Sequence, residues 1–209
     1  MQYEFPHARL IIFTKAPVAG QCKSRLAAGI GDEAAAKVQD MLIHRCLDAV
    51  NTSPLCPTEL WCASDSTHPF FQSIATNYPL SLYNQQGHDL GQRMFHAMSN
   101  KPAQATIIIG TDCPGISRHY IKSALQVLHD GKDVVIGPAE DGGYVLLGLK
   151  QIEPRLFTNI EWGTAQVYAQ TVQACQQQGL QWQPLQMLWD IDHESDLQRF
   201  NSLKSTVYE

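Results

Sequence analysis

Short apolar runs recur along the chain at intervals that suit the strands of a sheet. The clearest are "LIIF" (10–13), which Pro17 follows closely, and "ATIIIG" (105–110). Continuous apolar runs of this length, bounded by turn residues, are typical of strands that are buried on both faces. The pattern predicts strands at 9–16, 58–64, 80–85, 105–110, 133–139, 143–149 and 180–188.

Apolar residues at helical spacing lie between these runs. Val38, Leu42 and Cys46 recur at every fourth position, which places them on one face of a helix. Asp32 and Ser117 are good N-caps for the helices that follow them. The pattern predicts helices at 32–50, 70–76, 89–100, 117–128, 163–178 and 193–203.

Strands and helices therefore alternate through most of the chain, which is typical of an α/β fold with a mainly parallel central sheet. Only 143–149, which closely follows another strand, suggests an antiparallel member. The 209 residues contain no repeat or obvious linker, so we predict one domain, 1–209. In such sheets ligands bind outside the carboxyl ends of the strands, which points to the loops after "LIIF", "IIIG" and "VVIG".

The composition excludes several classes of function. The formal net charge is −5 and no Lys/Arg block exists, so the electrostatic footprint of a nucleic-acid-binding protein is missing. The 6 cysteines form no C-x-x-C pair and none has zinc-finger spacing, which favours a reducing compartment. No signal peptide and no apolar stretch of about 18 residues is present, so we expect a soluble cytoplasmic protein without a membrane span.

The loop after the first strand, "TKAPVAGQCKSRL", is rich in basic residues. Lys15, Lys23 and Arg25 surround Gly20, and Pro17 stiffens the loop. A loop that follows the first strand of an α/β sheet often binds phosphate, to which Lys offers a point charge and Arg a two-pronged donor. The spacing is not that of a Walker A loop. An ordinary surface loop explains these residues about equally well.

The hexamer "GTDCPG" (110–115) ends the strand at 105–110. Asp112 in this position can bind Mg²⁺ or Mn²⁺, hard cations that prefer oxygen ligands. An Asx-turn is the alternative, because Asp before Cys-Pro-Gly has good turn chemistry. Cys113 is a weaker candidate for a nucleophile, because no residue near it in sequence offers a base or a means of lowering its pKa.

Two acidic segments complete the candidate chemistry. In "GPAEDGGY" the neighbours Glu140 and Asp141 could act as acid and base, although "DGG" also suits a tight hairpin turn. In "WDIDHESDL" the alternation of Asp190 and Asp192 places both on one face of an extended segment, where one of them could join Asp112 at a metal. Asp192 also stands where the N-cap of the last helix would be.

Taken in order, these motifs resemble a known bacterial family. G-x-x-K-S-R-L, G-T-D-C-P, G-P-A-E-D-G-G-Y and D-I-D-x-x-x-D-L are similar to motifs of the nucleotide-diphospho-sugar transferase-like proteins, often labelled glycosyltransferases and similar to phospholactate guanylyltransferase. The resemblance runs from "LIIFTKAP" to "DLQRF". It implies a GT-A fold, a three-layer α/β/α Rossmann-like sandwich.

The resemblance also implies roles for individual residues. Family members usually have Thr or Ser after the late Asp, where this chain has His193, so Asp190 stays open as an alternative to Asp192. The implied roles are the following: catalysis by Lys23, Arg25, Asp112 and Asp141; nucleotide binding by Lys15, Gly20, Lys23, Arg25, Gly91 and Arg93; acceptor binding by Glu140, Asp141, Gly142 and Gly143; and binding of Mg²⁺ or Mn²⁺ by Asp112 and Asp192.

These parts suit a metal-dependent transferase that takes a nucleotide triphosphate or a nucleotide-sugar and a small-molecule acceptor. The basic loop favours nucleotidyl transfer from an NTP to a phosphorylated acceptor, whereas the usual label of the family favours glycosyl transfer. A non-catalytic binder of nucleotides or sugar phosphates is the third alternative. We expect Lys23 to be an exposed loop residue, so that Lys23→Ala would weaken nucleotide binding and change stability little.

Overall fold

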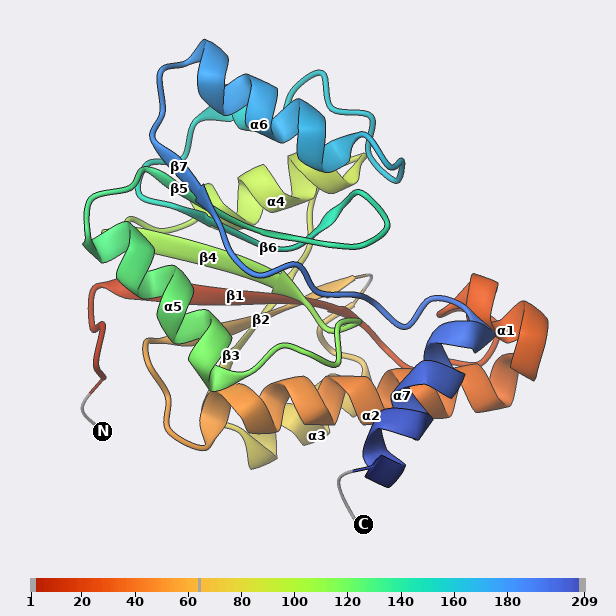
Figure 1. The fold of residues 1–209 in the computed structure, drawn as a ribbon. Helices are drawn as coiled ribbons and strands as arrows, with labels where there is room; N and C mark the ends of the chain where they lie inside the picture. The colour runs from red at the N-terminus through yellow and green to blue at the C-terminus, as the bar shows by residue number, and fades with distance from the viewer. Residues whose placement is uncertain (1–2, 64, 207–209) are drawn as a thin grey trace.

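The computed structural model describes residues 3–63 and 65–206, with side chains through Leu203. Within this part of the chain, seven strands form one sheet in the order β3-β2-β1-β4-β6-β5-β7 (Figure 1). The strands are β1 (Ala8–Lys15), β2 (Thr58–Ala63), β3 (Ser81–Asn84), β4 (Ala105–Gly110), β5 (Val134–Pro138), β6 (Tyr144–Leu149) and β7 (Trp182–Pro184).

Strand direction in the sheet follows the expectation from the sequence. The central strand β1 pairs in parallel with β2 on one side and β4 on the other. β6 is the antiparallel member and pairs with both β4 and β5. The three parallel strands β2, β1 and β4 therefore direct their carboxyl ends to one edge of the sheet, where the loops with the candidate chemistry begin.

Helices cover both faces of the sheet (Figure 1). Leu10 and Ile12 of β1 face the core that contains α2, α3 and α5, whereas Ile11 between them faces the core that contains α4 and α6. This alternation makes the chain a three-layer α/β/α sandwich, as the sequence predicts. The helices are α1 (Ser24–Ile30), α2 (Asp32–Asn51), α3 (Pro69–Asn77), α4 (Leu90–Ser99), α5 (Arg118–His129), α6 (Val167–Gln177) and α7 (Glu194–Thr206), with a 3₁₀ turn η1 (Pro154–Leu156).

A third, smaller core lies beside the sandwich, where α7 crosses α1 and α2 (Figure 1). Leu26 of α1, Leu42 of α2 and Phe200 of α7 pack there around Ile191, which is fully buried. This core fixes the last segment of the chain against the loop that follows β1. It thereby brings the acidic "DID" segment and the basic "CKSR" segment together.

Three details of the sequence prediction are wrong. The basic loop contains a short helix, α1, that the pattern did not indicate. Gly31 and not Asp32 is the N-cap of α2, and Asp32 lies in its first turn. The strand expected at 180–188 is limited to the three residues of β7, because β7 pairs only with β5 at the border of the sheet.

None of the helices in the described ranges is long and apolar enough to span a bilayer.

Candidate active site at the carboxyl edge of the sheet

A cleft of about 560 Å³ opens at the carboxyl ends of β1 and β4. It lies between the loop after β1, the first turns of α1 and α4, and the loop after β4. Predicted site residues from four separate segments of the chain therefore line one cavity. They are Lys15, Gly20, Lys23, Arg25, Arg93, Asp112 and Asp192.

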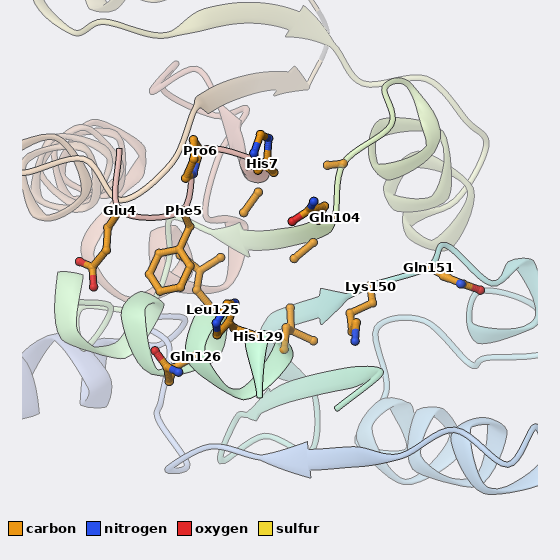
Figure 2. A pocket seen from close by; sticks show the side chains of 14 residues that line it. Glu4, Phe5, Pro6, His7, Gln104, Leu125, Gln126, His129, Lys150 and Gln151 are labelled. Atoms are coloured by element: carbon orange, nitrogen blue, oxygen red, sulfur yellow. The ribbon is translucent and has the colours of Figure 1, made fainter. Parts of the chain in front are cut away.

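A larger cavity of about 830 Å³ lies at the opposite edge of the sheet, where the N-terminal segment meets the end of α5 (Figure 2). His7, His129 and Lys150 line it together with apolar residues such as Phe5 and Leu125. It contains none of the predicted site residues. Because ligands in open α/β sheets bind outside the carboxyl ends of the strands, the smaller cleft is the better candidate for an active site.

Lys23 lies at the centre of the charged cluster in this cleft. Its side chain is only 3% exposed, and its Nζ lies 2.8 Å from Asp112 Oδ1 and 4.0 Å from Asp192 Oδ1. The same Nζ donates a hydrogen bond to the Ile191 carbonyl at 2.8 Å. The expectation of an exposed loop lysine is therefore wrong, because the distant "DID" segment covers the side chain.

The hexamer "GTDCPG" directs Asp112 toward the cleft. Thr111 is buried and hydrogen-bonded to Thr14 of β1 at 3.2 Å, which ties the ends of β4 and β1 together. Asp112 Oδ1 is buried, and its contact with Lys23 has the distance of an ion pair but not the geometry of a hydrogen bond. Cys113 is buried behind Asp112, and burial raises the pKa of its thiol to about 12, which excludes it as a nucleophile.

Asp190 and Asp192 approach the cleft from the last segment of the chain. The Ile191 amide donates to the Asp112 carbonyl at 3.0 Å, so the two acidic segments run side by side. Burial, followed by repulsion from Asp112 and Asp192, raises the pKa of Asp190 to about 7. Burial and repulsion from Asp112 also raise the pKa of Asp192, which Arg25 contacts at 3.3 Å. The cluster thus holds more negative charge than its neighbours neutralise.

The interpretation of Asp192 as a helix cap is wrong. The helix α7 begins at Glu194, so His193 occupies the N-cap position; Asp196 in the first turn reaches back, and its Oδ2 accepts hydrogen bonds from the amides of Asp192 and His193 at 3.0 and 2.7 Å. His193 therefore stands at the start of α7 without supplying the cap that a Thr or Ser would. The Asp192 carboxylate remains directed at Lys23 and Arg25.

The residues present fit a divalent cation that arrives together with a nucleotide. Among the described residues, no three His, Cys, Asp or Glu side chains come close enough to form a metal site by themselves. Mg²⁺ is commonly held by one or two carboxylates together with substrate phosphates. Asp112 and Asp192 form such a pair, and the buried Asp112 Oδ1 accepts no well-aligned hydrogen bond, its contact being the ion pair with Lys23.

The residues predicted for the acceptor form the hairpin turn between β5 and β6. Gly142 has φ 88°, and a Cβ at this position would collide with the Ala165 carbonyl. Asp141 Oδ1 accepts from the Gly143 amide at 2.9 Å. Glu140 makes a two-pronged ion pair with Arg199 of α7 at 2.7 and 3.0 Å, and this contact lowers the pKa of Glu140. The predicted hairpin turn is therefore confirmed, and the Glu140 carboxylate is occupied by its ion pair with Arg199.

Gly91 and Arg93 lie at the start of α4, which Asp89 caps by accepting from the Gln92 amide at 2.8 Å. Arg93 lines the cleft. Gly91 does not: it is buried, and a Cβ there would collide with the Trp162 indole. Gly91 thus allows the loop around Trp162 to pack on α4, and does not line the nucleotide cavity directly.

Sequence reasoning missed several residues that line the cleft, among them Gln39, Gln85 and Leu90. Gln39 is only 4% exposed although it is polar and lies on α2, and its side chain donates to the Lys15 carbonyl at 3.4 Å. Gln85 follows β3 and donates to the Trp61 carbonyl at 2.9 Å. Its place at the carboxyl end of a predicted strand was the signal that could have found it.

Known structures share this fold. A candidate nucleotide-diphospho-sugar transferase from Desulfovibrio desulfuricans G20 is similar with a TM-score of 0.82 and 28% identity, over 90% of this chain and 83% of that one. The inositol-1-phosphate CTP transferase from T. maritima has a TM-score of 0.60 and 11% identity, over 93% of both chains. The mannosyltransferase PcManGT from Pyrobaculum calidifontis, in complex with GDP-Man and Mn²⁺, has a TM-score of 0.58 and 13% identity, over 89% of this chain and 57% of that one.

These similarities confirm the expected fold, that of the nucleotide-diphospho-sugar transferases, whose members here include nucleotidyl and glycosyl transferases. No match was found among curated proteins. A family model described as "Uncharacterized protein conserved in bacteria (DUF2064)" matches residues 46–164, which is more than half of the 209 residues. The chain therefore belongs to this bacterial family.

Proposed function

We propose that the protein is a metal-dependent nucleotidyltransferase that transfers a nucleotidyl group from an NTP to a phosphorylated small acceptor. One observation carries the proposal: a single cleft of about 560 Å³ joins the basic loop after β1 to the carboxylates Asp112 and Asp192. Positive groups that bind phosphates and an acidic pair that binds a metal are the two parts that this chemistry needs.

Lys15 and Arg25 supply the positive charge that faces the cleft. Arg25 is 60% exposed, so its guanidinium can exchange Asp192 for phosphate oxygens and hold them with two parallel hydrogen bonds. Lys15 is exposed at the end of β1. Both groups would bind the β- and γ-phosphates and stabilise the pyrophosphate as it leaves.

Asp112 and Asp192 would hold the divalent cation. When bound, the cation would neutralise charge on the phosphates and make the α-phosphorus more electrophilic. An oxygen of the acceptor phosphate then attacks the α-phosphorus, and the bond from this atom to the pyrophosphate oxygen breaks. No proton needs to be removed from an ionised acceptor phosphate, so this reaction needs no general base.

Glycosyl transfer is the second candidate function. It is supported by the mannosyltransferase with GDP-Man and Mn²⁺ among the similar structures. In this reaction an acceptor hydroxyl attacks the sugar carbon, the bond from the sugar to the nucleoside diphosphate breaks, and a base takes the hydroxyl proton. Asp141 is the better choice for that base, because Arg199 already engages Glu140 and lowers its pKa. A non-catalytic nucleotide binder would use the cleft without either reaction.

A paired screen separates these functions. The protein is mixed with each NTP and a set of phosphorylated acceptors, and with nucleotide-sugars and hydroxyl acceptors, in Mg²⁺, in Mn²⁺ and in EDTA. Metal-dependent release of pyrophosphate supports nucleotidyl transfer, and release of a nucleoside diphosphate supports glycosyl transfer. Calorimetric binding of nucleotides without any product would support the binder.

Asp112→Asn and Asp130→Asn are the matched variants for this screen. Both remove one carboxylate, but Asp130 caps the end of α5, whereas Asp112 lines the cleft. The proposed function requires that only Asp112→Asn loses product. Nucleotide binding that is equally strong in EDTA and in Asp112→Asn would contradict a metal-dependent transferase.

A further inference from the structure

The buried ammonium of Lys23 lies in the place that the proposed metal should occupy. Its Nζ contacts Asp112 Oδ1 at 2.8 Å and approaches Asp192 Oδ1 at 4.0 Å. These two carboxylates are the ligands that the proposed function assigns to the divalent cation. In this structure a single positive charge from the chain itself sits between them.

This position also prevents Lys23 from binding phosphates. The side chain is only 3% exposed, and one of its three N–H donors is directed at the Ile191 carbonyl at 2.8 Å. A nucleotide in the cleft would meet the exposed Arg25 first, whose side chain is 60% exposed. Lys23 must therefore leave the carboxylates before it can contact a substrate.

The backbone at Lys23 is strained. With φ 46° and ψ 49° the residue is left-handed, and Asn159 is the other non-glycine residue with positive φ in the described ranges. A residue with a Cβ rarely adopts this conformation, which persists where the surrounding structure supports it. The ammonium of Lys23 contacts Asp112 and the Ile191 carbonyl while the backbone has this conformation.

We propose that Lys23 is an internal placeholder for the divalent cation. In the nucleotide-free protein its ammonium neutralises Asp112 and Asp192 and keeps the two segments together. When a divalent cation binds to these carboxylates, Lys23 is released, its backbone relaxes, and its ammonium becomes available to the phosphates of the bound nucleotide. This inference rests on the proposed function in one respect, the assignment of Asp112 and Asp192 as metal ligands.

The first test measures Mn²⁺ binding without nucleotide, by calorimetry and by the electron paramagnetic resonance of free Mn²⁺. The variants are Lys23→Met, which removes the competing charge and keeps an unbranched chain, and Lys37→Met, which removes an exposed lysine of α2 outside the cleft. We expect Lys23→Met to bind Mn²⁺ about tenfold more tightly than the wild type, because a positive charge at this distance opposes a second cation. Lys37→Met should bind Mn²⁺ as the wild type does, and adding Asp112→Asn to Lys23→Met should abolish the gain.

The second test uses the wild-type protein, so it does not depend on the folding of a variant. Lysines are acetylated briefly and mapped by mass spectrometry, with and without saturating Mn²⁺ at matched ionic strength. We expect Lys23 to be protected without Mn²⁺ and to react with it, while the exposed Lys150 reacts equally in both conditions.

The outcomes distinguish the two proposals. Equal Mn²⁺ affinity in the wild type and Lys23→Met, or a Lys23 that stays protected at saturating Mn²⁺, would overturn the placeholder and leave the metal site intact. Mn²⁺ binding in neither protein would overturn the placeholder, whereas the metal dependence of the proposed function is tested separately, by product release with nucleotide in Mg²⁺, Mn²⁺ and EDTA.

Discussion

Two clusters of buried charge lie at opposite edges of the sheet, and they are built differently. At the amino edge, Arg9 of β1 pairs with Glu59 of β2 at 3.1 Å, and each of the two side chains is 7% exposed. Arg9 also donates to the Ala97 carbonyl near the end of α4, while Glu59 accepts from Trp61 Nε1 and Lys101. Apart from Arg9 Nε, the charged groups have partners of opposite charge or good hydrogen bonds.

At the carboxyl edge the charges do not balance. Lys23 faces Asp112 and Asp192. Burial, followed by repulsion from these two carboxylates, raises the pKa of Asp190 to about 7. Asp112 Oδ1 lacks a hydrogen bond and the backbone of Lys23 is left-handed. A buried ionic network that satisfies its members holds elements together, whereas one with excess charge and strain is suited to bind a ligand of opposite charge.

The most severe test of this difference is the change of one carboxylate into an amide in each cluster. We expect Glu59→Gln to lower the free energy of unfolding by about 3–5 kcal/mol, because it leaves Arg9 as a buried charge without its partner. Urea denaturation followed by circular dichroism measures this loss. Glu4→Gln, which breaks a surface ion pair with Lys122 and Arg118, is the control and should change stability little. If Glu59→Gln and Glu4→Gln have similar free energies of unfolding, the amino-edge cluster does not stabilise the fold.

The same substitution at the other edge should act on function. We expect Asp112→Asn to lower metal-dependent product formation by at least about a hundredfold, because it removes a ligand of the cation that stabilises charge on the phosphates. Its stability should fall less than that of Glu59→Gln, because the change also relieves repulsion with Asp190 and Asp192, and because Lys23 keeps Asp192 and the Ile191 carbonyl as partners. An Asp112→Asn protein that unfolds as easily as Glu59→Gln would contradict the distinction between the clusters.

Metal binding should stabilise only the carboxyl-edge cluster. At a Mn²⁺ concentration of about 100 times its dissociation constant, the native state gains about 2.7 kcal/mol by mass action. The shift in the thermal unfolding midpoint on adding Mn²⁺, and its reversal by EDTA, measures this gain. The Asp192→Asn variant should lose the shift. The Glu59→Gln variant should keep it, although its unfolding midpoint without Mn²⁺ is lower than that of the wild type. If both variants keep the shift, Mn²⁺ binds at a site other than Asp112 and Asp192.

The smallest effect is expected at the Glu140–Arg199 ion pair, which is exposed. Arg199 lowers the pKa of Glu140 below its usual 4.5, so the pair contributes stability when the pH is above this value and loses it as the pH falls through the folded-state pKa. Denaturation midpoints of the wild type and Arg199→Gln, measured between neutral pH and about pH 3, should converge as the pH falls. A difference that stays constant with pH would mean that Arg199 acts through its packing on Trp189 instead.

Much of the fold could be predicted because local pattern and tertiary structure agree. "ATIIIG" forms β4 at the predicted bounds, Ser117 caps α5, and "DGG" turns the β5–β6 hairpin. These features depend on residues within a few positions of one another. The short helix α1 was missed because it follows Lys23, whose left-handed backbone and distant side-chain partner no local pattern indicates.

The sequence predicted which residues form the site but not how their side chains are arranged. The ordered motifs identified Lys23, Asp112 and Asp192, which the structure brings together. The burial of Lys23 depends on a carbonyl 168 positions away, and no local pattern contains that information. For the same reason no local pattern indicates that Arg9 and Glu59, two charges inside apolar strands, form a pair.

The hydrogen bond from the Ile191 amide to the Asp112 carbonyl has a consequence for biosynthesis. All seven strands of the described sheet precede Ile191 in the chain, so a nascent polypeptide can assemble the sheet before Asp192 has been made. A product truncated after β7 would keep Asp112 and the basic loop but would lack Asp192 and the helix that packs over them. Only a chain translated to its last segment can therefore complete the acidic pair.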